Sequence, residues 1–216
     1  MRTTILLVAV ALVSVPAWAD KVVPTGGPGT DSPSICDAIT GNLVSNCGFE
    51  TGDFTSWILS GNTTDIGVSS FSQAGYGPNS GEYYAFLGAV GSDDILSQAI
   101  ATIAGQSYVF TFYLASDGGT PNDFTAMFGG DTVFSETDIP QSGYVEWQYD
   151  VAASSSSTVI AFDSRDDPGF LSLDDISVVA GGTTATPEPR FYGMALGLLG
   201  LAGIVIGKRR KRDVTV

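Results

Sequence analysis

The chain has 216 residues, of which 44% are hydrophobic and only 15% charged, and it contains 27 glycines and no histidine. The 23 acidic residues outnumber 9 lysines and arginines, giving a formal charge of −14, and between Asp20 and Pro187 the only basic residues are Lys21 and Arg165. Such an acidic surface repels phosphate backbones, so nucleic acid is a poor partner. Without histidine, the commonest general base and metal ligand is missing.

The N-terminal segment has the pattern of a secretory signal peptide. A positively charged start and an almost unbroken apolar run over residues 5–15 precede the small-residue site Ala17-Trp18-Ala19. We therefore expect the secretion machinery to export the chain and residues 1–19 to be removed. The alternative is a buried N-terminal helix.

Residues 20–41 are rich in Gly, Pro, Ser and Thr and lack periodicity, which is typical of a leader or linker. Cys36 and Cys47 are the only cysteines, and in an exported chain they are expected to form a disulfide. Closing this loop should stabilise the fold by about 3 kcal/mol in the chain-entropy model and pin the leader to the first strand. Two free thiols are the alternative.

Residues 42–180 show the period-two alternation of β-strands. The clearest examples are residues 108–114, 145–151 and 158–162, where apolar or aromatic side chains occupy every second position. No stretch shows sustained helical amphipathicity, and Gly-, Pro-, Asn- and Asp-rich turns separate the strands. An all-β fold, an antiparallel β-sandwich, is predicted. The shorter candidate strands are residues 66–70, 83–87, 95–100, 124–128 and 171–179.

Two patterns at opposite ends of this region resemble the galactose-binding-like jelly rolls. Asn46-Cys47-Gly48-Phe49-Glu50, followed by Trp57, is similar to their N-G-x-F-E…W opening, although Cys47 stands where Gly is common, and residues 171–178 are similar to their closing strand. In that family the opening Glu and an Asp of the closing strand often bind structural calcium. The resemblance thus implies a calcium site at Glu50 and Asp174 or Asp175, whose hard oxygen donors suit this ion. The alternative is an ordinary exposed acidic strand end.

Glycan binding requires exposed aromatic rings beside polar groups, because sugar C–H faces stack on rings. The candidates are Tyr76 and Asn79, both in the turn over residues 74–79, and Tyr84. Structural roles are the alternative for all three. Catalysis has little support, since neither a Ser/His/Asp nor a Cys/His set can form, and a pair of carboxylates discriminates nothing among so many acids. We therefore expect the protein not to be an enzyme.

The C-terminus combines three features in a fixed order after a short linker, residues 181–185. The tripeptide Pro187-Glu188-Pro189 precedes an apolar run over residues 191–207. As a helix this run would be about 25 Å long, slightly short of a hydrocarbon core of ~30 Å. The positive-inside rule places the basic end that follows it in the cytoplasm, and a soluble core helix is the alternative. This basic end consists of Lys208, Arg209, Arg210, Lys211 and Arg212.

This order resembles the PEP-CTERM sorting signal of Gram-negative bacteria over residues 186–216, with Thr186 where Val is more usual. The resemblance implies transient anchoring in the inner membrane, processing near Pro-Glu-Pro by an exosortase, and delivery to the cell surface or matrix. Such proteins typically accompany exopolysaccharide production. We therefore expect an exported, non-catalytic surface protein that contacts exopolysaccharide. The alternative is a structural or adhesive protein that binds protein or itself.

Overall fold

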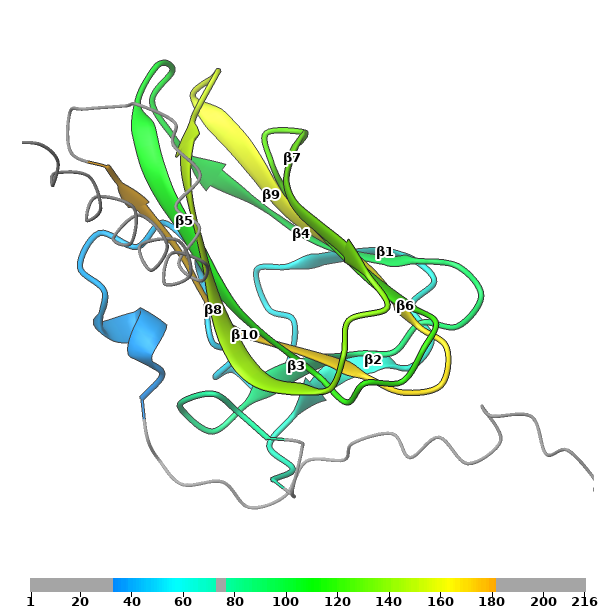
Figure 1. Ribbon diagram of the computed structural model, residues 1–216. Helices are drawn as coiled ribbons and strands as arrows, with labels where there is room; N and C mark the ends of the chain where they lie inside the picture. The colour runs from blue at the N-terminus through cyan, green and yellow to red at the C-terminus, as the bar shows by residue number, and fades with distance from the viewer. Residues whose placement is uncertain (1–32, 73–76, 182–216) are drawn as a thin grey trace, which may run out of the picture.

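Two five-stranded antiparallel sheets packed face to face form the part of the chain that the computed structural model describes, residues 33–72 and 77–181 (Figure 1). The only helix in these two ranges is the 3-10 helix η2 (Ile35–Ala38), so nothing there could serve as a membrane-spanning helix. Sheet A contains, in order across the sheet, β1 (Ile58–Gly61), β4 (Asp94–Ala101), β9 (Ser157–Asp166), β6 (Asn122–Phe128) and β7 (Asp131–Thr137). Sheet B contains β2 (Ile66–Ser69), β3 (Tyr84–Leu87), β10 (Leu171–Ala180), β5 (Ser107–Ser116) and β8 (Ser142–Ala152).

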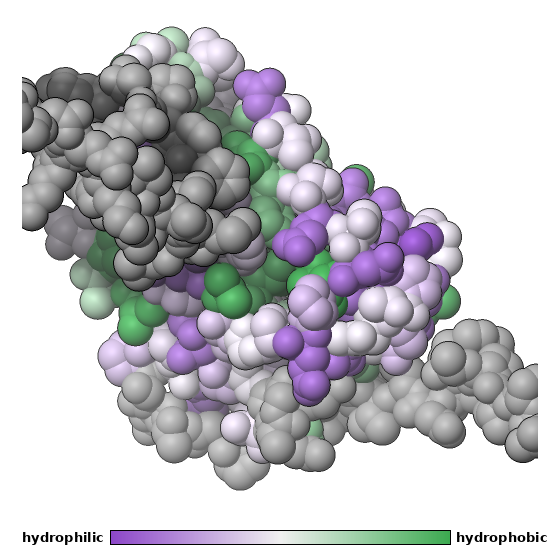
Figure 2. Space-filling model, in the orientation of Figure 1, coloured by the Kyte–Doolittle hydropathy of each residue, from purple (hydrophilic) through white to green (hydrophobic). Residues whose placement is uncertain are grey.

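The core between the sheets is built largely from aromatic rings. Phe112 of β5 and Phe162 of β9 face each other across the sandwich with ring centroids 5.4 Å apart. Full burial of such a side chain stabilises the fold by about 1.5–3 kcal/mol. Figure 2 shows apolar side chains in the opening between the two sheets. Rings that pack around Phe112 also include Phe110, Phe124, Phe134 and Tyr149.

The expected all-β sandwich is thus confirmed, but two strands escaped the sequence analysis. Both β1 and β7 are edge strands of sheet A, and each buries almost nothing. In β7 only Phe134 is buried, and in β1 Ile58 is 64% exposed. Because an edge strand that buries a single side chain shows no alternation, its sequence looks like that of a loop.

The segment that leads into β1 is irregular rather than a strand. Its Leu43 N–H donates to the Val178 carbonyl, and the Ile176 N–H donates to the Cys47 carbonyl. These bonds place the segment beside the second half of β10, whose first half, Leu171 to Leu173, pairs with β3. The segment therefore completes the hydrogen bonding of β10 where β3 ends.

The register of sheet B brings polar side chains together on its outer face, which points away from the core. In one row Tyr113 of β5 lies between Glu146 of β8 and Asp174 of β10. In the next row Thr111 lies between Gln148 and Ser177. The intervening Phe112 and Trp147 point inward. We call the side of the sheet formed by these six residues the outer face of sheet B: Glu146 and Gln148 are exposed there and Tyr113 is half-buried, whereas Thr111, Asp174 and Ser177 are buried.

Candidate functional site

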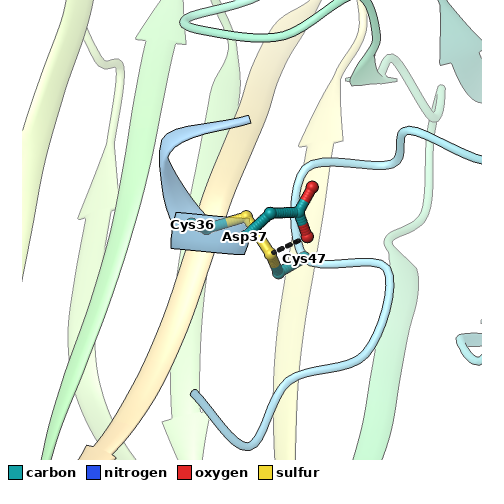
Figure 3. A group of neighbouring side chains, drawn as sticks. All are labelled: Cys36, Asp37 and Cys47. Atoms are coloured by element: carbon teal, nitrogen blue, oxygen red, sulfur yellow. Dashed lines mark hydrogen bonds between the residues drawn. A yellow bond between two sulfur atoms is a disulfide. The ribbon is translucent and has the colours of Figure 1, made fainter. Parts of the chain in front are cut away.

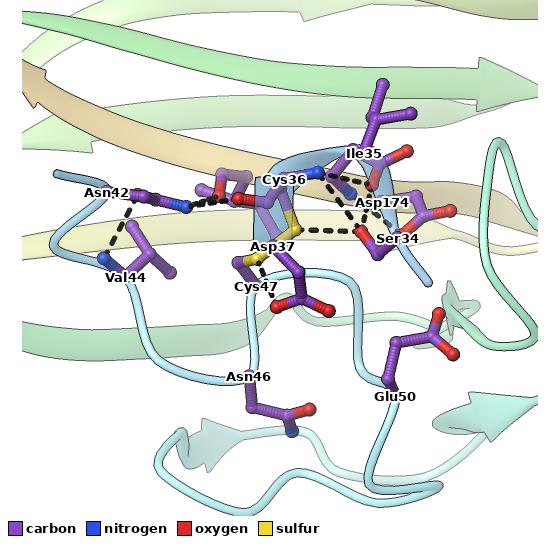
Figure 4. The surroundings of a disulfide bond; sticks show 12 residues. Ser34, Ile35, Cys36, Asp37, Asn42, Val44, Asn46, Cys47, Glu50 and Asp174 are labelled. Atoms are coloured by element: carbon purple, nitrogen blue, oxygen red, sulfur yellow. Dashed lines mark hydrogen bonds between the residues drawn. A yellow bond between two sulfur atoms is a disulfide. The ribbon is translucent and has the colours of Figure 1, made fainter. Parts of the chain in front are cut away.

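The expected disulfide joins Cys36 and Cys47 and fixes the leader against β10 (Figure 4). Asn42 strengthens this attachment, since its side-chain amide donates to the carbonyls of Cys36 and Ile176. Neither cysteine is in a strand, so the disulfide ties the leader to the irregular segment beside β10 and not, as predicted, to a first strand. Residues 33–41, assigned to the linker from sequence, belong in part to the packed structure.

Asp175 lies at an irregularity of β10, where the pairing register shifts, and its φ of +50° is left-handed. Its buried carboxylate accepts hydrogen bonds from the hydroxyls of Ser34 and Ser80 and from the side-chain amide of Asn79. The carboxylate therefore connects the leader, the turn over residues 79–83 and β10. Of the two candidate ligands, Asp174 is the one that shares a partner with Glu50, since both accept N–H groups of the turn over residues 79–83.

Asp174 and Glu50 are both held by the turn over residues 79–83. Asp174 Oδ2 accepts the first two backbone N–H groups of this turn, at 2.8 and 3.3 Å. Glu50 accepts the N–H groups at its end, at 3.0 to 3.3 Å. Gly81 lies between them with φ +70°, and a Cβ there would lie 2.0 Å from Glu50 Oε1. Only glycine fits this position without displacing Glu50.

The electrostatics of these two carboxylates suit a bound cation. Burial, and then the neighbouring Asp175, raise the pKa of Asp174 well above its usual range. Burial also raises the pKa of Glu50, with the negative charge of Asp37 adding to it and backbone N–H groups opposing it. Figure 4 shows Glu50 and Asp174 on the same side of the disulfide. A hard cation would compensate both charges, so the donor set fits the calcium implied by the family resemblance.

A second group of potential ligands, Cys36, Asp37 and Cys47, does not form a metal centre (Figure 3). It is the one set of three such side chains within 4.8 Å of one another in the described ranges. Both sulfurs are consumed by the disulfide, so no thiolate is available. Asp37 Oδ1 only contacts Cys47 Sγ, at 3.5 Å. Any ion at Glu50 and Asp174 would therefore need backbone carbonyls or water as its further ligands.

The three residues predicted to bind glycan do not come together as a site. Tyr76 lies outside the described residues, and the side chain of Asn79 is committed to Asp175. Tyr84 does point outward from sheet B, but it is fully buried in a small cluster with Phe86 and Phe170. No sugar can stack on its ring, so the prediction for Tyr84 is wrong.

A different site is formed beside the outer face of sheet B. It is a hollow of about 510 Å³ between the loop that follows β2 and the adjoining ends of β5, β8 and β10. We call it the serine pocket. Its volume is within the range of ligand sites, about 300–1,000 Å³. Polar residues of its lining are Ser72, Ser116, Gln141, Ser142, Tyr144 and Ser172.

Two tyrosines connect the serine pocket with the outer face of sheet B. The Tyr144 hydroxyl donates to the Gly77 carbonyl at 2.9 Å, which fixes one wall of the pocket. Burial, and then Asp174, raise the pKa of Tyr144 well above its usual range. Burial and the hydrogen-bonded carboxylate of Glu146 likewise raise the pKa of Tyr113. Both phenols therefore stay neutral at physiological pH, and their single O–H protons are already donated to Gly77 and Glu146, which leaves their oxygens as acceptors.

The negative charge around this site has no basic counterpart within the described ranges except Arg165. Arg165 is on β9 and pairs with Asp123 and Asp167, with Nε 3.4 and 3.8 Å from their carboxylate oxygens. Arg165 is therefore a local ion-pair partner. Figure 2 shows hydrophilic side chains gathered over the end of the sandwich where Figure 1 labels β6.

The sorting motif Pro187-Glu188-Pro189, the apolar run over residues 191–207 and the basic residues Lys208 to Arg212 lie outside the described residues. The same holds for the signal peptide, residues 1–19.

Comparison with known proteins finds a similar fold in solved carbohydrate-binding modules. No family model and no curated protein matches this sequence. The structure is similar to a family 61 carbohydrate-binding module solved with β-1,4-galactotriose, with a TM-score of 0.51 and 20% identity, covering 66% of this chain and 100% of that one. It is also similar to a xylan-binding domain of family 22, with a TM-score of 0.51 and 15% identity, covering 68% of this chain and 100% of that one. The sandwich is therefore a jelly roll of the kind found in these modules.

Proposed function

We propose that this is an exported, non-catalytic surface protein whose sandwich binds a polysaccharide at the serine pocket and the outer face of sheet B. The observation that carries the proposal is the pocket at the start of β8, whose lining residue Tyr144 lies two residues before Glu146 and four before Gln148, with Glu146 paired to Tyr113 of β5. A phenol ring offers a stacking surface, while carboxylate, amide and hydroxyl groups offer directional hydrogen bonds to sugar hydroxyls. Sugar binding by structural neighbours of the same fold supports it.

The sequence patterns at the two ends of the chain support a proposal for where in the cell the protein is located. The apolar N-terminal run supports export, and the order of Pro-Glu-Pro, apolar run and basic cluster in residues 186–216 supports anchoring in the inner membrane followed by exosortase processing. The ligand would then be an exopolysaccharide at the cell surface or in the matrix.

We also propose a structural calcium ion held by Glu50 and Asp174. An ion there would neutralise the two carboxylates and hold the turn over residues 79–83 in place. This turn is continuous with Gly77 and Pro78, which line the serine pocket. Calcium would therefore support the site by holding this part of its wall.

Glycan-array screening of the full chain, followed by calorimetry with the best oligosaccharide, tests the binding proposal. Tyr113→Ala should weaken binding by about tenfold or more and Gln148→Ala by about fivefold. Thr125→Ala is the matched control, because Thr125 lies on the outer face of sheet A, where it contacts Ser135. Saturable binding that responds to Thr125→Ala and not to Tyr113→Ala would contradict the proposed site. A complete lack of binding would contradict the function.

The second candidate is the adhesive protein, and one observation favours it. Ile58 and Val159 are 64% and 47% exposed on sheet A, where they could contact protein or a second copy of the chain. Sedimentation of the full chain would then show concentration-dependent association that Ile58→Ser reduces. An unchanged monomer over the same concentrations would leave this candidate without support.

A further inference from the structure

The proposed glycan site lies in a negative field that continues along β8. Glu146 and Asp150 are exposed on the outer face of this strand, in register with Tyr113 and Val109 of β5. Four residues along a strand correspond to about 13 Å, so the two carboxylates could contact separate units of one oligosaccharide.

No described side chain could neutralise an anionic ligand at this place. Arg165 is the one basic residue in the described ranges, and it lies on the other sheet with Asp123 and Asp167. A uronic acid or a sulfated sugar would bring its charge close to Glu146 with no compensating cation. At surface distances of a few ångströms such repulsion lowers affinity by about fivefold or more.

The position of β8 makes these carboxylates accessible to a charged ligand. As the edge strand of sheet B, β8 pairs only with β5 among the described strands. Its carboxylates can remain partly hydrated until a cation replaces water, so charge pairing there avoids the full penalty of burying an ion. A protonated amine can donate three hydrogen bonds, and a hydrogen bond between charged partners is about twice as strong as one between neutral groups.

We propose that the glycan bound on the outer face of sheet B carries protonated amino groups, as does an oligomer of glucosamine. This inference rests on the proposed function and adds the charge class of the ligand. Glu146 and Asp150 pair with the amines, while Tyr113 and the serine pocket contact the neutral parts of the sugar.

Calorimetry on the full chain with three oligosaccharides of equal length tests the inference. The probes are a glucosamine oligomer, its fully N-acetylated form and a galacturonic acid oligomer, compared at about pH 6, where amines and exposed carboxylates are both charged. The glucosamine oligomer should bind about tenfold more tightly than the N-acetylated form, and added salt should remove most of this difference. The galacturonic acid oligomer should bind most weakly.

Two substitutions locate the effect. Glu146→Gln removes the charge and keeps the size of the side chain, and it should weaken binding of the amine-bearing oligomer about fivefold more than it weakens binding of the N-acetylated one. Asp131→Asn removes the same charge from an exposed position on β7 and should change neither.

The possible outcomes distinguish a failure of this inference from a failure of the proposed glycan binding. Equal binding of the glucosamine and N-acetylated oligomers, or a preference for galacturonic acid, would overturn the inference while glycan binding stands. An equal loss of the amine-bearing ligand in Asp131→Asn would show that overall charge, and not Glu146, is responsible. Failure of every sugar, both in this series and on the glycan array, would remove the proposed function itself.

Discussion

The buried carboxyl group of Asp94 should make the protein less stable as the pH rises. Asp94 begins β4, pairs with Gly61 of β1 and Ser164 of β9, and is fully buried. One carboxyl oxygen accepts the Ser164 hydroxyl at 2.8 Å, while Oδ2 is buried with no hydrogen-bond partner. Ionisation therefore leaves a charge in the core that a single hydroxyl must stabilise.

The size of the effect follows from the pKa. Burial raises the pKa of Asp94 from 3.8 to about 7, opposed by Ser164 and reinforced by the charges of Asp163, Asp93 and Asp123. Since the folded state holds this proton more tightly than the unfolded state, stability is fully present below about pH 4 and is lost as the pH rises through 7. The whole shift corresponds to about 4 kcal/mol, of which about 2–3 kcal/mol falls between pH 5 and pH 8.

Asp94→Asn isolates this contribution, because asparagine is nearly isosteric and does not ionise. Urea unfolding of the full chain, followed by tryptophan fluorescence, should show wild type and variant with similar stability at pH 5. At pH 8 the variant should be more stable by about 2–3 kcal/mol. Asp131→Asn, at an exposed position, should change stability equally at both pH values. An equal effect of Asp94→Asn at the two pH values would refute the reasoning, since it would mean that Asp94 ionises normally.

Three further predictions concern the elements that hold the site. Replacing Cys36 and Cys47 together by Ser should lower the free energy of unfolding by about 3 kcal/mol. A reducing agent should then no longer affect the stability of this variant. A urea midpoint equal to that of the wild type would contradict this prediction. Gly81→Ala should destabilise the protein by about 1–3 kcal/mol more than Gly41→Ala does. Gly41 is the control because it has a similar φ of +81° but open space around it. Equal urea midpoints for the two variants would show that Glu50 does not confine this turn. Calcium should raise the melting temperature and a chelator should lower it, with no response in Glu50→Gln; a wild type insensitive to both would remove the calcium proposal.

The sandwich could be predicted from sequence because several of its strands alternate. Residues 108–114 lie within β5, which buries Tyr108, Phe110, Phe112 and Leu114, and residues 145–151 lie within the edge strand β8, where half-buried Trp147, Tyr149 and Val151 alternate with exposed residues. Strand β7 could not be found in this way, because it buries only Phe134. Alternation reports burial, so it does not detect a strand whose contribution is mainly hydrogen bonding at an edge.

The candidate site was harder to predict because it depends on which strands are neighbours. The polar positions Glu146 and Gln148 were visible in the sequence, and so was Tyr113 opposite the apolar face of its strand. The row that joins Glu146 and Tyr113 to Asp174 exists only because β10 inserts between β3 and β5, which alternation does not encode. Tyr84 shows the converse error, since it faces outward but is covered in its cluster with Phe86 and Phe170.

Chemical-shift mapping of the labelled full chain, titrated with an oligosaccharide selected on the glycan array, tests the central claim most directly. The account predicts saturable shifts at Tyr113, Tyr144 and Gln148, on the outer face of sheet B and in the serine pocket. Shifts confined to the opposite sheet, around Thr125 and Val159, would contradict it, because the sugar would then bind a surface to which we assign no glycan contact.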